Sequence, residues 1–105
     1  MLTGSDASDV LALANAQQFA LPAANCIGSN SMNAVMETAG KLNSPVIIQF
    51  SSSGAAFVAG KAVPGGGDRA SVLGSVAGAK HVRTLDCIGL HEGAARGRNA
   101  LVAMQ

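Results

Sequence analysis

The chain has 105 residues, of which 49% are hydrophobic, but only three are aromatic and all of these are Phe. Its 13 Gly and many Ala offer little side-chain area for burial, so we expect at most one domain, completed by a larger neighbouring body. Seven Lys and Arg against six Asp and Glu give a net charge of +1, which excludes the basic footprint of a protein that binds nucleic acid or an anionic membrane.

Three features that are missing from the sequence indicate the cellular compartment that we expect for the protein. No uninterrupted apolar run reaches the roughly 18 residues that a membrane-spanning helix needs. The N-terminus carries Asp6 and Asp9 and lacks the basic segment of a secretory signal. Cys26 and Cys87 lie far apart, and without an export signal we expect reduced thiols. The sequence therefore predicts a cytoplasmic protein.

The first part of the chain alternates helical and strand-like segments. A capping box that starts at Thr3 and the apolar periodicity after it predict a helix over 5–18. A short apolar run over 19–26 predicts a strand. Ser29 is the expected N-cap of a second helix, which ends near residue 41.

The second part opens with the clearest strand, 46–50, an apolar run without alternation that is typical of a strand covered on both faces in a parallel sheet. A small-residue segment follows, and the Pro-Gly-Gly-Gly run at 64–67 predicts a loop. Asp68 is the expected cap of a third helix, which ends near residue 85. Beyond it, 87–90 is a candidate strand and 99–104 a candidate apolar turn of helix.

The alternation of helices and strands predicts an α/β fold in which helical crossovers connect parallel strands. Units of this length suit either a (β/α)8 barrel or a doubly wound sheet. Two or three βα units cannot close an eight-stranded barrel. The pattern alone therefore leaves both architectures open.

Two familiar kinds of site find little support. The glycines of 54–60 have five residues between them, and Ala62 follows Lys61 where a phosphate-binding loop needs Ser or Thr, so a nucleotide-binding protein is a distant alternative. Lys61 is then a solvated cation or one close to a substrate. His81 is expected on a helix surface, His91 has only an adjacent Glu, and the cysteines are scattered. We therefore assign no metal ligand in this chain.

The strand ends are more informative. Asn25 and Ser51 each follow an apolar strand and open a loop. In parallel α/β folds, ligands bind at the carboxyl ends of the strands. The Asn25 amide and the Ser51 hydroxyl, with the small residues that follow, could bind a phosphate. The alternative is that both residues only cap helices and form turns.

The same strand ends belong to a longer resemblance. From about residue 2 to about residue 85, the sequence resembles the N-terminal part of class II fructose-bisphosphate aldolases. Five segments carry this resemblance in order and without large gaps: 20–28, 31–39, 44–51, 54–61 and 73–82.

The resemblance implies a partial TIM (β/α)8 barrel that holds the first two or three βα units with parallel strands. Proteins of this family are zinc-dependent, cytosolic homodimers of glycolysis and gluconeogenesis. They reversibly cleave fructose 1,6-bisphosphate into dihydroxyacetone phosphate and glyceraldehyde 3-phosphate. The family residues that match Asn25 and Ser51 contact the substrate near a phosphate-bearing end, whereas the lysine that matches Lys61 has no assigned role.

The resemblance ends near Leu85. The family continues with a strand that ends in Asp-His-Cys and carries the catalytic Asp and the first zinc ligand, but 86–98 contain no Asp-His pair. We therefore divide the chain into 1–85, part of an aldolase barrel, and 86–105, a divergent tail. A truncated gene model, a frameshift or a splice product would each explain the change. No catalytic residue is assigned, and we expect the isolated chain to be inactive and to hold no zinc.

A second hypothesis is a binding or assembly module without catalysis. Such a module would expose the apolar faces of 46–50 and associate with itself or with an intact aldolase subunit.

Overall fold

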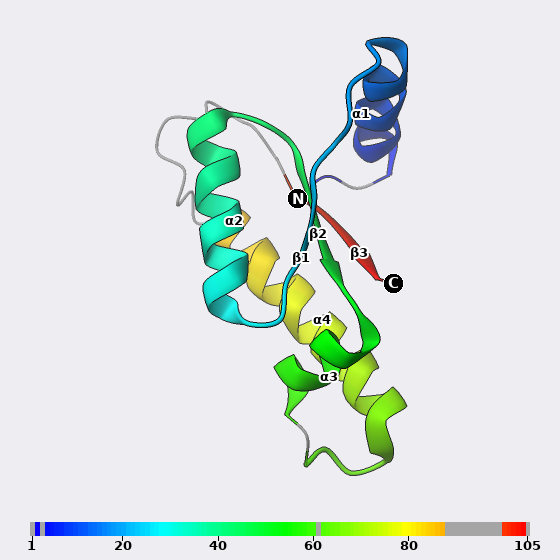
Figure 1. The fold of residues 1–105 in the computed structure, drawn as a ribbon, viewed down its shortest axis with the longest axis vertical. Helices are drawn as coiled ribbons and strands as arrows, with labels where there is room; N and C mark the ends of the chain where they lie inside the picture. The colour runs from blue at the N-terminus through cyan, green and yellow to red at the C-terminus, as the bar shows by residue number, and fades with distance from the viewer. Residues whose placement is uncertain (1, 3, 61, 88–99, 105) are drawn as a thin grey trace.

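The computed structural model describes residues 2, 4–60, 62–87 and 100–104 of the chain. Helices and strands alternate along most of it (Figure 1). In chain order they are α1 (Ser5–Ala16), β1 (Ala23–Asn25), α2 (Ser29–Leu42), β2 (Val46–Phe50), α3 (Ser52–Ala59), α4 (Gly66–Cys87) and β3 (Ala100–Met104). None of the helices in the described ranges is both long and apolar enough to cross a membrane.

The three strands form one parallel sheet in the order β1-β2-β3. Asn25 of β1 lies opposite Gln49 of β2, and Phe50 of β2 lies opposite Met104 of β3. The predicted α/β fold with parallel strands is therefore confirmed. Because parallel strands point the same way, their carboxyl ends share one edge of the sheet.

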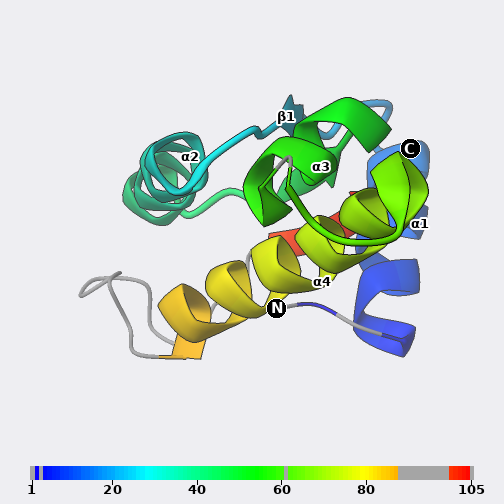
Figure 2. The same ribbon diagram turned by 90° about the horizontal axis from the view of Figure 1, so that it is seen from below.

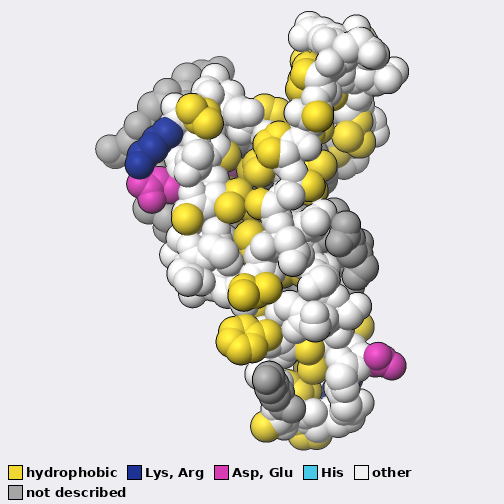
Figure 3. Space-filling view, viewed as in Figure 1, with side chains coloured by type: hydrophobic (Ala, Val, Ile, Leu, Met, Phe, Trp, Pro, Cys, Tyr) yellow, Lys and Arg dark blue, Asp and Glu magenta, His cyan; other side chains and the backbone are white. Residues whose placement is uncertain are grey.

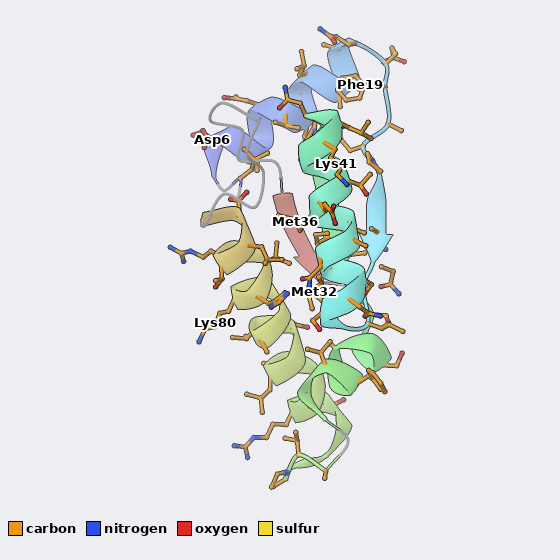
Figure 4. The ribbon with its side chains drawn as sticks, turned by 90° about the vertical axis from the view of Figure 1, so that its left-hand side faces the viewer. Asp6, Phe19, Met32, Met36, Lys41 and Lys80 are labelled. Carbon is orange, nitrogen blue, oxygen red and sulfur yellow. The ribbon has the colours of Figure 1, made fainter. Side chains whose placement is uncertain are left out.

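The core lies between one face of β2 and the helices α2 and α4, which lie side by side (Figure 2). Alternate residues of β2 are buried on this face: Val46, Ile48 and Phe50. They pack with Met32 and Met36 of α2, which are labelled in Figure 4. The remaining buried core residues are Cys26, Ala39, Ala55, Val82 and Leu85.

Two expectations about β2 need correction. Its unbroken apolar run predicted coverage of both faces, but Ile47 and Gln49 on the second face are only half-buried, because α2 and α4 pack on the first. The assembly hypothesis required exposed apolar faces on this strand. The face of Val46, Ile48 and Phe50 is instead buried inside the chain.

Glycines allow α4 to approach its neighbours closely. A Cβ atom on Gly74 would collide with the backbone carbonyl of Ala55 in α3, and one on Gly78 would collide with the Phe50 ring. These two glycines are spaced four residues apart and therefore lie on the same side of α4. Gly74 and Gly78 thus allow α4 to pack closely against α3 and against β2.

The N-terminal helix lies apart from α2, α3 and α4 (Figure 1), and Ala14 is its one buried residue. Its N-cap is Gly4, without a side-chain cap, so the predicted capping box is wrong; Thr3 lies outside the described residues. The helix ends two residues earlier than predicted. Gln18 adopts a left-handed φ of 56°, which is incompatible with a continued helix.

The predicted starts of two other helices are also wrong. Gly28, not Ser29, is the N-cap of α2, and Ser31 Oγ accepts a hydrogen bond from the Gly28 N–H at 3.3 Å. The α4 helix begins at Gly66, inside the glycine run that predicted a loop. The strand β1 is shorter than predicted, at three residues.

The last part of the chain departs most from its sequence signals. Residues 99–104 predicted a helical turn, but Ala100–Met104 form β3, because this segment pairs with β2 along its whole length. Cys87 is the last residue of α4, and 88–90 of the candidate strand lie outside the described residues. The helix α3 was not predicted, since its Ser, Gly and Ala residues carry little periodicity.

Candidate functional site

Asn25 and Ser51 meet at the carboxyl edge of the sheet. Asn25 is the last residue of β1, and Ser51 follows the last residue of β2. The backbone N–H of Ser51 donates a hydrogen bond to Asn25 Oδ1 at 3.2 Å. The expectation that the two side chains lie at the same end of the sheet is confirmed. Their role in substrate binding stays a prediction.

Ser51 also begins α3. It is the N-cap, in an extended conformation with φ −74° and ψ 158°, and its Oγ accepts a hydrogen bond from the Gly54 N–H at 3.2 Å. A side-chain oxygen at this position satisfies one of the backbone donors that a helix start leaves unpaired. Ser51 therefore caps a helix, which is the alternative role that the sequence left open for it.

These contacts use acceptor atoms and leave donors facing outwards. Asn25 is exposed and Ser51 half-buried. Within the ranges that the structure describes, no hydrogen bond occupies Asn25 Nδ2 or is donated by the Ser51 hydroxyl. Both groups can therefore donate to an oxygen of a ligand, beside the positive end of α3. This arrangement suits a phosphate or a sugar hydroxyl.

Gly54, one of the small residues after Ser51 that the sequence offers for binding a phosphate, also belongs to this site. A Cβ atom here would lie 3.1 Å from Ser51 Oγ and 3.1 Å from Ile27 Cγ2, in the loop after β1. Its N–H is the donor to Ser51 Oγ. Glycine thus lets the start of α3 lie close to that loop. The signal was present as a Ser followed three residues later by Gly.

His81 is not the isolated surface histidine that its neighbours predicted. It is half-buried, and its Nε2 lies within hydrogen-bonding distance, 2.8 Å, of Asn33 Oδ1. This contact joins α4 to α2, 48 residues apart in sequence. We therefore assign His81 to the packing of the two helices and not to the site.

The remaining candidates do not form a metal site in the described ranges. Lys61 and His91 lie outside those ranges. Cys26 is a free, buried thiol; burial raises its pKa, and a hydrogen bond with Ser31 lowers it by less. No three His, Cys, Asp or Glu side chains gather in the part of the chain that is described. These residues therefore do not provide a ligand set for zinc.

A sequence profile decides the family. The profile described as "Fructose-bisphosphate aldolase class-II" matches residues 5–91. The chain belongs to this family. A fructose-bisphosphate aldolase from Haemophilus influenzae is 56% identical to this class II chain over 86 residues, which are 81% of the chain and 24% of that relative. A class 2 fructose-bisphosphate aldolase from Escherichia coli is 48% identical over 89 residues, with the same two shares.

A solved structure agrees with this assignment. The crystal structure of a fructose-bisphosphate aldolase from Campylobacter jejuni superimposes with a TM-score of 0.79 and 41% sequence identity, and the match covers 99% of this chain and 27% of the other. The α/β fold of this chain is thus part of an aldolase TIM barrel. The chain spans about a quarter of the length of its class II relatives.

Proposed function

We propose that this chain forms the first βα units of a class II fructose-bisphosphate aldolase and provides Asn25 and Ser51 for binding a sugar bisphosphate near one of its phosphates. The observation that carries the proposal is the 3.2 Å hydrogen bond between Ser51 N–H and Asn25 Oδ1. It fixes the two side chains beside each other and leaves their donors free for an anionic oxygen. Membership of the family supports the substrate class.

The reaction of the complete barrel is the reversible, zinc-dependent cleavage of fructose 1,6-bisphosphate into dihydroxyacetone phosphate and glyceraldehyde 3-phosphate. We propose a cytoplasmic setting in glycolysis and gluconeogenesis and a homodimeric whole enzyme. In this chain, residues 1–85 are proposed as part of the aldolase barrel and 86–105 as a tail that diverges in sequence, although its residues 100–104 add the parallel strand β3. The described residues supply binding groups and no zinc ligand set, so the isolated chain binds without cleaving.

The test is a titration of the full chain with fructose 1,6-bisphosphate and, separately, with inorganic phosphate, followed by nuclear magnetic resonance of the backbone amides. We expect the signals of Ser51 and Gly54 to shift. Asn25→Asp keeps an oxygen that accepts from the Ser51 N–H but replaces the Nδ2 donor by a negative charge. Because hydrogen bonds to charged groups contribute about 1.5–3 kcal/mol, affinity should fall by about tenfold or more.

The matched control is Asn15→Asp, which makes the same change of charge on α1, away from the sheet edge. It should leave the affinity within about twofold of the unsubstituted chain, since exposed charges at a distance are screened by salt. Equal losses in both variants, or shifts that avoid Ser51 and Gly54, would show that this pair does not bind the phosphate.

A further inference from the structure

Ser71 connects α4 to the first residue of α3. Its Oγ lies 2.7 Å from the carbonyl oxygen of Ser52 and 2.9 Å from that of Gly67, four residues earlier in its own helix. Ser and Thr side chains inside helices commonly donate to the carbonyl four residues back. Within the described ranges, Thr84 does only this, to Lys80 C=O at 2.9 Å. The shorter contact, to a residue of another helix, therefore distinguishes Ser71 from an ordinary helical hydroxyl.

A second contact holds the same turn of α3. Gly74 lies three residues after Ser71, on the same side of α4, and lets this helix approach the backbone carbonyl of Ala55. Ser52 and Ala55 are likewise three residues apart, in the first turn of α3. Figure 2 shows α3 lying against α4. Two contacts along one side of α3 fix its position on α4 and its rotation about its own axis.

The carbonyl that Ser71 contacts belongs to the same peptide unit as the N–H of Ser53. This peptide lies one residue after Ser51, the N-cap of α3. The first N–H groups of a helix lack partners within the helix, and in the described ranges no hydrogen bond occupies the Ser53 N–H. A hydrogen bond to the carbonyl side of a peptide polarises it and strengthens its N–H as a donor. Ser71 therefore acts on a donor close to Ser51.

Neutral donors prevail at the start of α3. Among the described side chains on the face in Figure 3, Lys and Arg gather mainly at the outer edge of α2, away from α3. The groups already placed at the site are the Asn25 amide and the Ser51 hydroxyl, which carry no charge. A phosphate bound here depends on hydrogen bonds from such neutral donors, so the strength and direction of each donor affect its affinity.

We propose that Ser71 is a positioning residue for the phosphate end of the site. Its hydroxyl orients and polarises the peptide between Ser52 and Ser53, so that the Ser53 N–H donates to a phosphate oxygen beside the Ser51 hydroxyl. This role rests on the proposed function, because it needs a phosphate at Ser51. Ser71 itself acts through the peptide and not on the ligand.

The experiment titrates the full chain with fructose 1,6-bisphosphate and, separately, with inorganic phosphate, and follows the backbone amides by nuclear magnetic resonance. Ser71→Ala should weaken the binding of both ligands by about threefold to tenfold, the effect of one hydrogen bond. In the chain without ligand, the Ser53 amide signal should also move, because its peptide loses a hydrogen bond. Since Ala favours helix more than Ser does, α4 should stay folded.

Two variants serve as controls. Ser71→Thr keeps a hydroxyl on the same carbon and should restore both the affinity and the position of the Ser53 signal. Thr84→Val removes a hydroxyl that contacts only its own helix, and should leave both unchanged. Where Ser71→Ala does not fold, Ser71→Cys takes its place, because it keeps the shape of the side chain and donates only weakly.

Three results would overturn this role: unchanged affinity in Ser71→Ala, an equal loss in Thr84→Val, and a loss of affinity with an unmoved Ser53 signal. A loss for fructose 1,6-bisphosphate without one for inorganic phosphate would also overturn it, since Ser71 would then act elsewhere than at the phosphate. Absence of binding by the unsubstituted chain has a different meaning. It would overturn the proposed function of Asn25 and Ser51, and the role of Ser71 with it.

Discussion

The hydrogen bond from Ser51 N–H to Asn25 Oδ1 ties together two strand ends that are 26 residues apart in sequence. It joins the end of β1 to the first residue before α3, at the one edge where both strands terminate. The bond occupies the amide oxygen of Asn25, and the cap of α3 occupies a lone pair of Ser51 Oγ. Structural and binding roles therefore use different atoms of the same two side chains.

The cap itself can be measured. Ser51→Ala removes the oxygen that accepts from Gly54 N–H and should lower the free energy of unfolding by about 1 kcal/mol. Urea unfolding followed by circular dichroism gives this value. Ser53→Ala, at an exposed position two residues later, should change it by less than about 0.5 kcal/mol. Similar losses in both variants would mean that the cap contributes little.

The close approach of α4 to α3 predicts a strong position effect among glycines. Gly74→Ala forces a Cβ atom against the backbone of Ala55, which cannot move aside as a side chain could, and should cost about 3 kcal/mol. Gly67→Ala, near the start of the same helix, has nothing within 4 Å of the new Cβ. It should stabilise the chain by up to about 1 kcal/mol, because Ala favours helix. Thermal unfolding would separate the two variants, and equal midpoints would contradict the packing shown here.

The contact between His81 and Asn33 predicts energetic coupling between α4 and α2. Each single alanine substitution should lower the free energy of unfolding by about 1 kcal/mol through loss of the 2.8 Å hydrogen bond. The double variant should lose less than the sum, with a coupling of about 0.5 kcal/mol or more. The exposed pair Glu37 and Lys41 provides the comparison, with side chains 62% and 72% exposed, and should couple more weakly. Additive losses for His81 and Asn33 would show that the contact is not maintained in solution.

Local sequence patterns predicted the elements whose own residues carry the signal. The apolar run of Val46–Phe50 and the periodic apolar face of α2 both identified their elements to within one residue. The meeting of Asn25 and Ser51 was also predictable, because parallel pairing follows from alternating helices and strands.

The errors lie where distant contacts decide the conformation. Residues 100–104 form β3 because they pair with β2, and their own sequence pattern does not predict this pairing. α4 extends into a glycine run that favours a loop locally, and its Gly74 fits the backbone of α3. The second face of β2 carries Ile47 beside the polar Gln49 and is only half-covered, because α2 and α4 pack on the first face.

We predict that the isolated chain has no aldolase turnover, because residues 86–98 lack the Asp-His pair that the resemblance to the family leads us to expect. Purified chain incubated with fructose 1,6-bisphosphate and added zinc should release triose phosphates at the background rate. The full-length Escherichia coli relative is the positive control. Turnover that scales with the concentration of the chain, and that a metal chelator abolishes, would contradict this prediction.

The buried thiol of Cys26 predicts a loss of stability at alkaline pH. Burial raises the pKa of Cys26, so the folded chain keeps a proton that the unfolded chain releases above its ordinary pKa of about 8.5. The free energy of unfolding should therefore be independent of this group at neutral pH and fall as the pH rises from about 8.5 through the raised pKa.

Urea unfolding under reducing conditions, between about pH 7 and about pH 9.5, measures this dependence. All variants carry Cys87→Ser, so that one thiol titrates. Adding Cys26→Ala should lower the free energy of unfolding at neutral pH, through the cavity it leaves, and should remove its fall at alkaline pH, so the two proteins approach each other in stability as the pH rises. A fall that persists in Cys26→Ala would assign the pH dependence to other groups. The same background allows a direct check, because a thiol reagent should modify Cys26 only after the chain unfolds.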